Sequence, residues 1–214
     1  MISKEFRDRL VKRSRLVGAE LDSDIVDHLD TYFTLLVKWN EKLNLTGLPL
    51  NPITDQAVDR LFLEPLAAAR YVPSSLLVWF DVGSGGGSPA LPLKIIRPLA
   101  ELTMVESKSR KAAFLREAVR ALDLRNTSVR DRRFEDLAAD PADLHVADLI
   151  TVRAVKLSNE LLKAILSHVR DQGSVFLFGS SGVSPAPDLA VTKTVQLTQQ
   201  PSSTLAILRR AGNG

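Results

Sequence analysis

The sequence predicts an α/β protein, in which a largely parallel sheet with helices on both faces is preceded by a small helical region. Two patterns favour this class. Residues 1–75 repeat apolar side chains at helical spacing, whereas residues 76–214 alternate short apolar runs with helical segments. The chain has 214 residues and 45% hydrophobic residues, enough for a full core, so disorder as a whole is excluded. We therefore divide it into a helical N-terminal region, 1–75, and a sheet domain, 76–214.

Three helices are predicted in the N-terminal region. Apolar residues recur in the first up to Gly18, a plausible stop, and the second runs from an N-cap at Asp22 to about Asn44. Asn51-Pro52 opens the third, because proline suits a first helical position, and Pro65 is expected to interrupt it.

The sheet domain is predicted from the alternation of strands and helices. Apolar runs too short for helices are expected to be strands at 77–80, 102–105, 127–129, 149–152 and 174–178. Helices are expected between them at about 89–96, 109–122 and 158–169. Such alternation indicates βαβ units and a parallel sheet. A loop at 180–188 and two strands at 193–197 and 204–208 complete the chain, the strands forming an antiparallel end of the sheet.

Composition excludes several kinds of chemistry. The chain has no cysteine, so it has no disulfide, cysteine zinc site, iron–sulfur cluster or cysteine nucleophile. Three scattered histidines form no metal-binding motif, and no metal is expected. No apolar run reaches about 18 residues and the N-terminus lacks a signal-peptide pattern, so we expect a soluble cytoplasmic protein with no membrane partner.

Positive charge is concentrated in one segment. Between Lys108 and Arg133 lie nine bases and three acids, although the whole chain carries only +3. Such density is compatible with a phosphate-rich partner, and an isolated charge run is also typical of a solvated face. The segment favours a nucleic-acid partner only together with other observations.

A glycine-rich turn follows the first predicted strand and precedes a helix, in the segment Asp81-Val82-Gly83-Ser84-Gly85-Gly86-Gly87-Ser88. Glycines let a backbone approach a ligand closely, and the following helix supplies free N–H groups. The dinucleotide fingerprint G-x-G-x-x-G fails at Ser88, and no Gly-Lys-Ser/Thr follows for a P-loop. The spacing G-x-G-x-G behind Asp81 is that of S-adenosylmethionine (SAM)-dependent methyltransferases.

An acid stands about twenty residues beyond the loop. Glu106 ends the second predicted strand, where a carboxylate can accept the ribose hydroxyls of a nucleoside. Alone, such an acid is more often a helix cap; with the glycine loop it favours a nucleoside cofactor.

At these residues the sequence resembles the RsmG family, also called GidB, which methylates N7 of a guanine in 16S rRNA with SAM. The resemblance covers about 32–179 and rests on five blocks in order: Trp39-Asn40 with Asn44-Leu45-Thr46; the loop 81–93; Glu106-Ser107 with Arg110-Lys111 and Phe114-Leu115; Arg133-Phe134-Glu135; and Arg153-Ala154. Three positions depart from the family pattern. Leu61 to Pro65 replaces H-x-x-D-S, Ala90 replaces a glycine, and Phe178 replaces a lysine.

The resemblance implies roles for the matching residues. Around SAM it places Asp81, Gly83, Ser84, Gly85 and Gly87 at the methionine end, Glu106 and Ser107 at the ribose, and Phe134 and Glu135 at the adenine. On the acceptor side it places Asn44 and Thr46 in the base pocket. The basic residues expected to reach RNA phosphates are Lys108, Arg110, Lys111, Arg130, Arg132 and Arg133. Arg153 is the candidate catalytic residue beside the transferred methyl; a salt bridge to Asp81 or Asp148 is an equally good interpretation of it.

The chemistry agrees with this composition. Guanine N7 has an in-plane lone pair and needs no deprotonation, so the enzyme has mainly to orient it toward the methyl donor. Two other functions stay open: methyl transfer to another RNA or a small molecule, and a SAM-binding regulator without turnover. An NAD(P) enzyme is disfavoured by Ser88. The partner implied is 16S rRNA or the small ribosomal subunit, and a monomer is expected.

Overall fold

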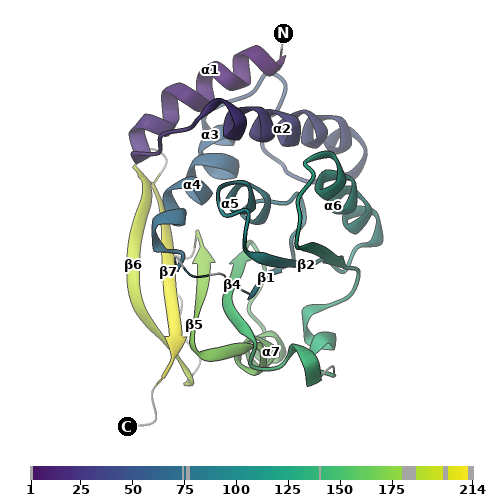
Figure 1. The fold of residues 1–214 in the computed structure, drawn as a ribbon, viewed down its shortest axis with the longest axis vertical. Coiled ribbons are helices and arrows are strands. Elements are labelled where there is room, and N and C mark those ends of the chain that lie inside the picture. Colours follow the sequence, from purple (N-terminus) through teal and green to yellow (C-terminus); the bar gives the residue numbers. More distant parts are fainter. Residues whose placement is uncertain are drawn as a thin grey trace.

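A computed structural model describes residues 2–73, 75, 78–139, 141–179, 187–199 and 202–211. Its centre is a seven-stranded sheet in the order β3-β2-β1-β4-β5-β7-β6 (Figure 1). The strands are β1 Val78–Val82, β2 Glu101–Val105, β3 Thr127–Arg130, β4 Ala147–Arg153, β5 Val169–Phe178, β6 Leu189–Gln199 and β7 Ser202–Arg210. The first five are paired in parallel, and β7 runs antiparallel to both β5 and β6. The predicted α/β class and the antiparallel end are confirmed.

The helices alternate with the strands as the sequence predicts. Their bounds are α1 Ile2–Ser14, α2 Ser23–Leu43, α3 Asp55–Val58, α4 Glu64–Ala68, α5 Ala90–Ile96, α6 Ser109–Ala121 and α7 Asn159–His168. Five short helical segments lie beside them: η1 Arg15–Val17, η2 Asp59–Leu63, η3 Ala69–Tyr71, η4 Phe134–Ala139 and η5 Pro141–Asp143. None of the helices in the described part of the chain is both long and apolar enough to cross a bilayer.

The two faces of the sheet have separate cores because side chains alternate along each strand. Trp79 on β1 packs with the helical region, α5 and α6, whereas its neighbour Phe80 packs with α7 and η4. The N-terminal helices therefore share one hydrophobic core with a face of the sheet. The division of the chain into regions 1–75 and 76–214 stays a proposal about its organisation.

Local signals set the ends of the first two helices as predicted. Gly18 caps η1 in the left-handed conformation, and the Asp22 carboxylate accepts the N–H of Ile25 at 2.8 Å at the start of α2. Asn44 ends α2, also left-handed, with φ 49°.

The third helix starts later than predicted, and its α-helical pattern is interrupted just before Pro65, as expected. It begins at Asp55, because the Thr54 hydroxyl accepts the N–H of Ala57, while Asn51-Pro52 lies in a turn closed by a bridge between Leu50 and Ile53. Pro65 does not end the helix. A π-helical turn, η2, precedes it, and α4 and η3 continue to Tyr71. Leu77 and most of the predicted loop 180–188 lie outside the described residues.

Candidate active site

The predicted cofactor and acceptor residues meet at the carboxyl ends of the central strands. The glycine loop follows β1, Glu106 follows β2 and Arg153 ends β4. Because β1 lies between β2 and β4, the chain leaves β1 at the point where the strand order reverses. Ligands of open α/β sheets bind in the crevice at such a switch point.

The loop after β1 is held by its own backbone. The N–H groups of Gly83 and Ser84 donate to the carbonyl of Val105 at 2.9 and 3.1 Å. Gly83, Gly85 and Gly87 have φ of 65°, 51° and 89°, the left-handed region that favours glycine. A Cβ on Gly83 or Gly87 would meet a side chain at 2.6 or 2.5 Å, whereas a Cβ on Gly85 would meet nothing nearer than 3.7 Å. Gly85 is therefore the loop position with space for a ligand.

Glu106 ties this loop to α6. Its two carboxylate oxygens accept the N–H of Lys108 at 2.8 Å and the N–H of Gly85 at 2.9 Å. Glu106 is not the N-cap of α6, because Lys108 takes that position; Glu106 instead accepts the N–H of this cap residue just before the helix. An ionised carboxylate has about four acceptor positions, so about two are left for ribose hydroxyls. The contacts of Glu106 and of exposed Ser107 with ribose stay predictions.

Asp81 is the buried acid beneath the loop. Its Oδ1 accepts the hydroxyl of Thr151 at 2.5 Å, its carbonyl accepts the hydroxyl of Ser84, and its Oδ2 has no hydrogen-bond partner among the described residues. Burial raises the pKa of Asp81 to about 6, against the lowering effect of the Thr151 hydrogen bond. A buried carboxylate oxygen without a partner, on the strand that leads into the glycine loop, fits a cofactor with a sulfonium and an ammonium group.

Phe134 points away from the cofactor edge. Its side chain is buried, with ring centroids 6.1 Å from Phe80 and 4.8 Å from His168. The contact with adenine stays a prediction, and only the backbone of Phe134 and the half-buried Glu135 are placed to make it.

Arg153, at the end of β4, is held by several groups. Its guanidinium donates to the Arg60 carbonyl (2.5 Å), the Ser88 hydroxyl (2.9 Å) and the Glu64 carboxylate (2.5 Å). It also lies 4.7 Å from the centroid of the Phe178 ring. The alternative of a salt bridge is confirmed, but its partner is Glu64 and neither of the two acids named from the sequence; Asp148 pairs with Arg170 at the other end of β4.

The segment after α2 closes over the loop from the helical side. The Tyr32 hydroxyl donates to the Gly86 carbonyl at 2.6 Å, and the Leu45 carbonyl would lie 3.1 Å from a Cβ on Gly86. Asn44 and Thr46 flank Leu45, and the Thr46 N–H donates to the Asn40 side chain. The structure therefore brings both residues beside the glycine loop, and their role in a base pocket stays a prediction.

The basic segment surrounds the start of α6. Lys108 is its N-cap, and Arg110 and Lys111 are in its first turn. Of the nine bases from Lys108 to Arg133, only Arg130 forms an ion pair with a described residue, Asp143. Asp143 therefore neutralises Arg130. The other eight basic residues form no ion pair with a described residue, so no such ion pair would compete with RNA phosphates for them.

Sequence reasoning missed four polar residues at this edge: Tyr32, Glu64, Ser88 and Thr151. Only Glu64 carried a signal, since it is an acid at the aligned position of the acid in the family's H-x-x-D-S. The others form contacts between distant segments that no spacing shows.

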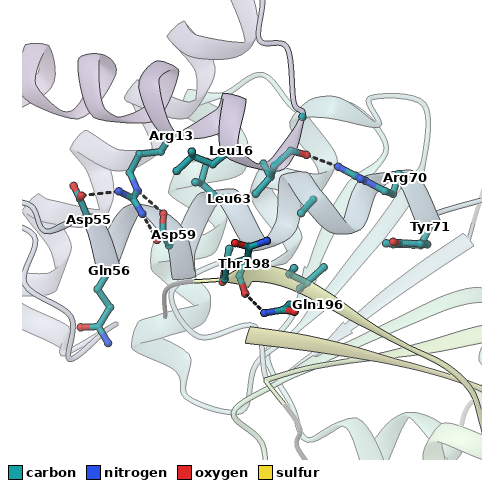
Figure 2. A pocket seen from close by; sticks show the side chains of 15 residues that line it. Arg13, Leu16, Asp55, Gln56, Asp59, Leu63, Arg70, Tyr71, Gln196 and Thr198 are labelled. Carbon is teal, nitrogen blue, oxygen red and sulfur yellow. Dashed lines mark hydrogen bonds and ion pairs between the residues drawn. The ribbon is translucent and has the colours of Figure 1, made fainter. Parts of the chain in front are cut away.

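The structure also has a cavity of about 900 Å³ (Figure 2). It is formed by η1, the helix from Asp55 to Tyr71, and β6, and ion pairs from Arg13 to Asp55 and Asp59 cross it. None of its lining residues belongs to the predicted site.

The sequence matches the family model described as rRNA small subunit methyltransferase G, GidB, over residues 25–203, which include every predicted site residue. The chain belongs to this family. Curated relatives with that name include a protein of Roseiflexus sp. (strain RS-1), 37% identical, with 87% of this chain and 78% of the relative aligned. Another, from Xanthomonas campestris pv. campestris (strain B100), is 36% identical over 82% and 77% of the two chains.

Solved structures support the fold alone. A SAM-dependent methyltransferase from Aquifex aeolicus has a TM-score of 0.55 at 14% identity, over 73% of this chain and 94% of that one. A point mutant of MtNAS in complex with S-adenosylmethionine has a TM-score of 0.58 at 11% identity, over 99% and 97%.

Proposed function

We propose that this protein transfers the methyl group of SAM to N7 of a guanine in 16S rRNA. Family membership over most of the chain is the observation that carries this function. The residues fit it: an open glycine loop, an acid with spare acceptor positions and a fixed arginine share one edge of the sheet.

Bound SAM supplies an electrophilic methyl group, and the chain's residues bind and orient. The loop 83–87 approaches the methionine end, Asp81 offers a buried negative charge, and Glu106 accepts the ribose hydroxyls. Guanine N7 needs no general base, so the acceptor side has only to hold the base in line. Because N7 must stay free, Arg153 is left to donate to O6 or to a phosphate.

In this proposal the RNA-facing surface consists of the basic residues of α6 and the following loop that form no ion pair with a described residue. Lys108, Arg110 and Lys111 lie at the start of α6, beside the proposed cofactor site. RNA phosphates must pass there if a nucleobase is to enter the site. We propose further that the protein acts as a cytoplasmic monomer without a metal, on rRNA or the small subunit. Light scattering of the purified protein and retention of activity in EDTA test the monomeric state and the independence from metal.

Purified protein incubated with SAM and under-methylated 16S rRNA or 30S subunits is expected to yield N7-methylguanosine, measured by nucleoside mass spectrometry. The matched control is Gly85→Asp, which should yield none. SAM binding without that product contradicts the proposal. An assay with labelled SAM and fractionated RNA and metabolites then distinguishes the two alternatives. Methyl transfer to another acceptor predicts a labelled fraction, whereas a SAM-binding regulator without turnover predicts no labelled fraction.

A further inference from the structure

The helix from Asp55 to Tyr71 has a register break beside Arg153. In the π-helical turn η2 the N–H of Glu64 donates to the carbonyl of Asp59, five residues back. The next residue, Pro65, has no N–H to donate. The carbonyl of Arg60 is thus left without a helical donor, and that of Leu61 loses its usual i+4 donor.

Both carbonyls accept side chains from the active edge instead. Arg60 O accepts Nη1 of Arg153 at 2.5 Å, and Leu61 O accepts the hydroxyl of Ser88 at 2.8 Å. Ser88 in turn accepts a second hydrogen bond from Arg153 Nη1 at 2.9 Å. The break in this helix therefore provides the acceptors that hold Arg153 against the end of the glycine loop.

The carboxylate of Glu64 completes the arrangement. Glu64 is fully buried; its Oε2 lies 2.5 Å from Nη2 of Arg153 and its Oε1 lies 3.1 Å from Nη1 of Arg60. Three of the five N–H groups of Arg153 are thereby used. The Nε–H and one Nη2–H have no partner among the described residues, although the side chain is only 17% exposed.

We propose that Glu64 is a positioning residue for Arg153. With Pro65 and the carbonyls it frees, Glu64 fixes the guanidinium plane so that its two unused N–H groups stay available to the methyl acceptor. The role in catalysis rests on the proposed function. A guanidinium held in advance loses less freedom on binding, which favours orientation of the acceptor.

A matched control lies on the same helix. Asp59 is also buried, at 1% exposed, and forms an ion pair of 2.5 Å with Arg13, but no described contact joins it to Arg153. Asp59→Asn therefore reproduces the structural cost of losing a buried acid and leaves Arg153 in place.

The first test is a double-mutant cycle measured in kcat for RNA. Glu64→Gln is expected to lower kcat by about 10- to 100-fold while the Kd for SAM changes by less than about twofold. In an Arg153→Lys background the same change should cost less than about twofold, because the group it positions is gone. Asp59→Asn should lower Tm and leave kcat unchanged. Equal losses in both backgrounds would overturn the proposal.

If Glu64→Gln does not fold, Pro65→Ala is the second variant to test. Pro65→Ala keeps the Glu64 carboxylate, so it leaves no buried charge without its partner. The restored N–H competes for the carbonyls of Arg60 and Leu61, and we expect kcat to fall about 3- to 10-fold with unchanged SAM affinity. Unchanged kcat would contradict the role given to these carbonyls.

The second test needs no turnover. In ¹⁵N-labelled protein the guanidinium of Arg153 should give separate, slowly exchanging Nη resonances. Glu64→Gln should merge them by freeing rotation, and Asp59→Asn should not. If Glu64→Gln alone merges the resonances but the protein methylates no RNA, the proposed function is refuted and the positioning role of Glu64 stands. Resonances unaffected by Glu64→Gln refute the positioning even if methylation is found.

Discussion

The two sides of the site, proposed for the cofactor and for the methyl acceptor, are built differently. The loop proposed for the methionine end of the cofactor is one stretch of chain, 81–87, fixed by backbone hydrogen bonds and by Glu106 just after β2. The acceptor side joins Arg153 to Glu64, 89 residues earlier, and to the Arg60 carbonyl, 93 residues earlier. The first depends on local conformation and the second on packing of the helical region. Substitutions should therefore separate SAM binding from acceptor binding.

The largest effect is expected at Gly85. Gly85→Asp places a side chain at φ 51° into the open space of the loop, so SAM affinity should fall on the order of 100-fold or more. Isothermal titration calorimetry measures this directly. Gly47→Asp is the control, because a Cβ there meets nothing within 4 Å, and it should keep full SAM affinity. A normal Kd for Gly85→Asp would remove the loop from the cofactor side.

Glu106 should show the next largest effect. Glu106→Ala removes the proposed ribose acceptors and leaves two N–H groups unpaired, so SAM affinity should fall about 10- to 100-fold. Glu106→Gln keeps one acceptor oxygen and should lose less. If Glu106→Ala binds SAM as tightly as Glu106→Gln, the carboxylate serves only to tie the loop to α6.

Removal of positive charge at the start of α6 should weaken RNA binding and leave SAM binding unchanged. Replacing Lys108, Arg110 and Lys111 together by Ala should weaken RNA affinity about tenfold and reduce the slope of log K against log salt by up to about three, with SAM affinity unchanged. The contrasting variant is Arg7→Ala with Arg9→Ala, because these arginines are already paired with carboxylates. Equal loss of RNA affinity in both variants would show that the RNA-facing surface extends over the helical region.

An effect of similar size is a pH dependence of SAM affinity carried by Asp81. Its pKa is raised from 3.8 to about 6, so ionisation disfavours the folded apo protein, and its contribution to stability falls as pH rises from about 4 to 6. A cationic cofactor favours the ionised form. SAM affinity should therefore rise about tenfold between pH 5 and 7, with a midpoint near 6. Asp81→Asn should abolish this dependence; a dependence that persists belongs to another group.

The cofactor side was predictable because its signals are short-range. Buried strands, the G-x-G-x-G turn and an acid at the next strand end all lie within about 25 residues. Parallel pairing then brings strand ends to one edge without further information.

Other predictions failed because a second contact competed with the one that the sequence pattern indicated. Asn51-Pro52 looks like a helix start, but the Thr54 hydroxyl supplies a better cap. Phe134 reads as a ligand contact, but a buried cluster with Phe80 and His168 takes its ring inward. Arg130 reads as a phosphate ligand, but Asp143 pairs with it.

The sequence by itself determined the strand–helix order, the glycine loop and the family resemblance, because periodicity and turn chemistry act between near neighbours in the chain. Only the tertiary structure decided which charges are neutralised and which stay free. Pro65 shows the difference most clearly. The sequence predicts that Pro65 interrupts the helix, whereas only packing continues the helix past it and gives the freed carbonyls to Arg153 and Ser88. A hydrogen-bonding group left unpaired locally must find its partner in space, and that partner is set by the fold.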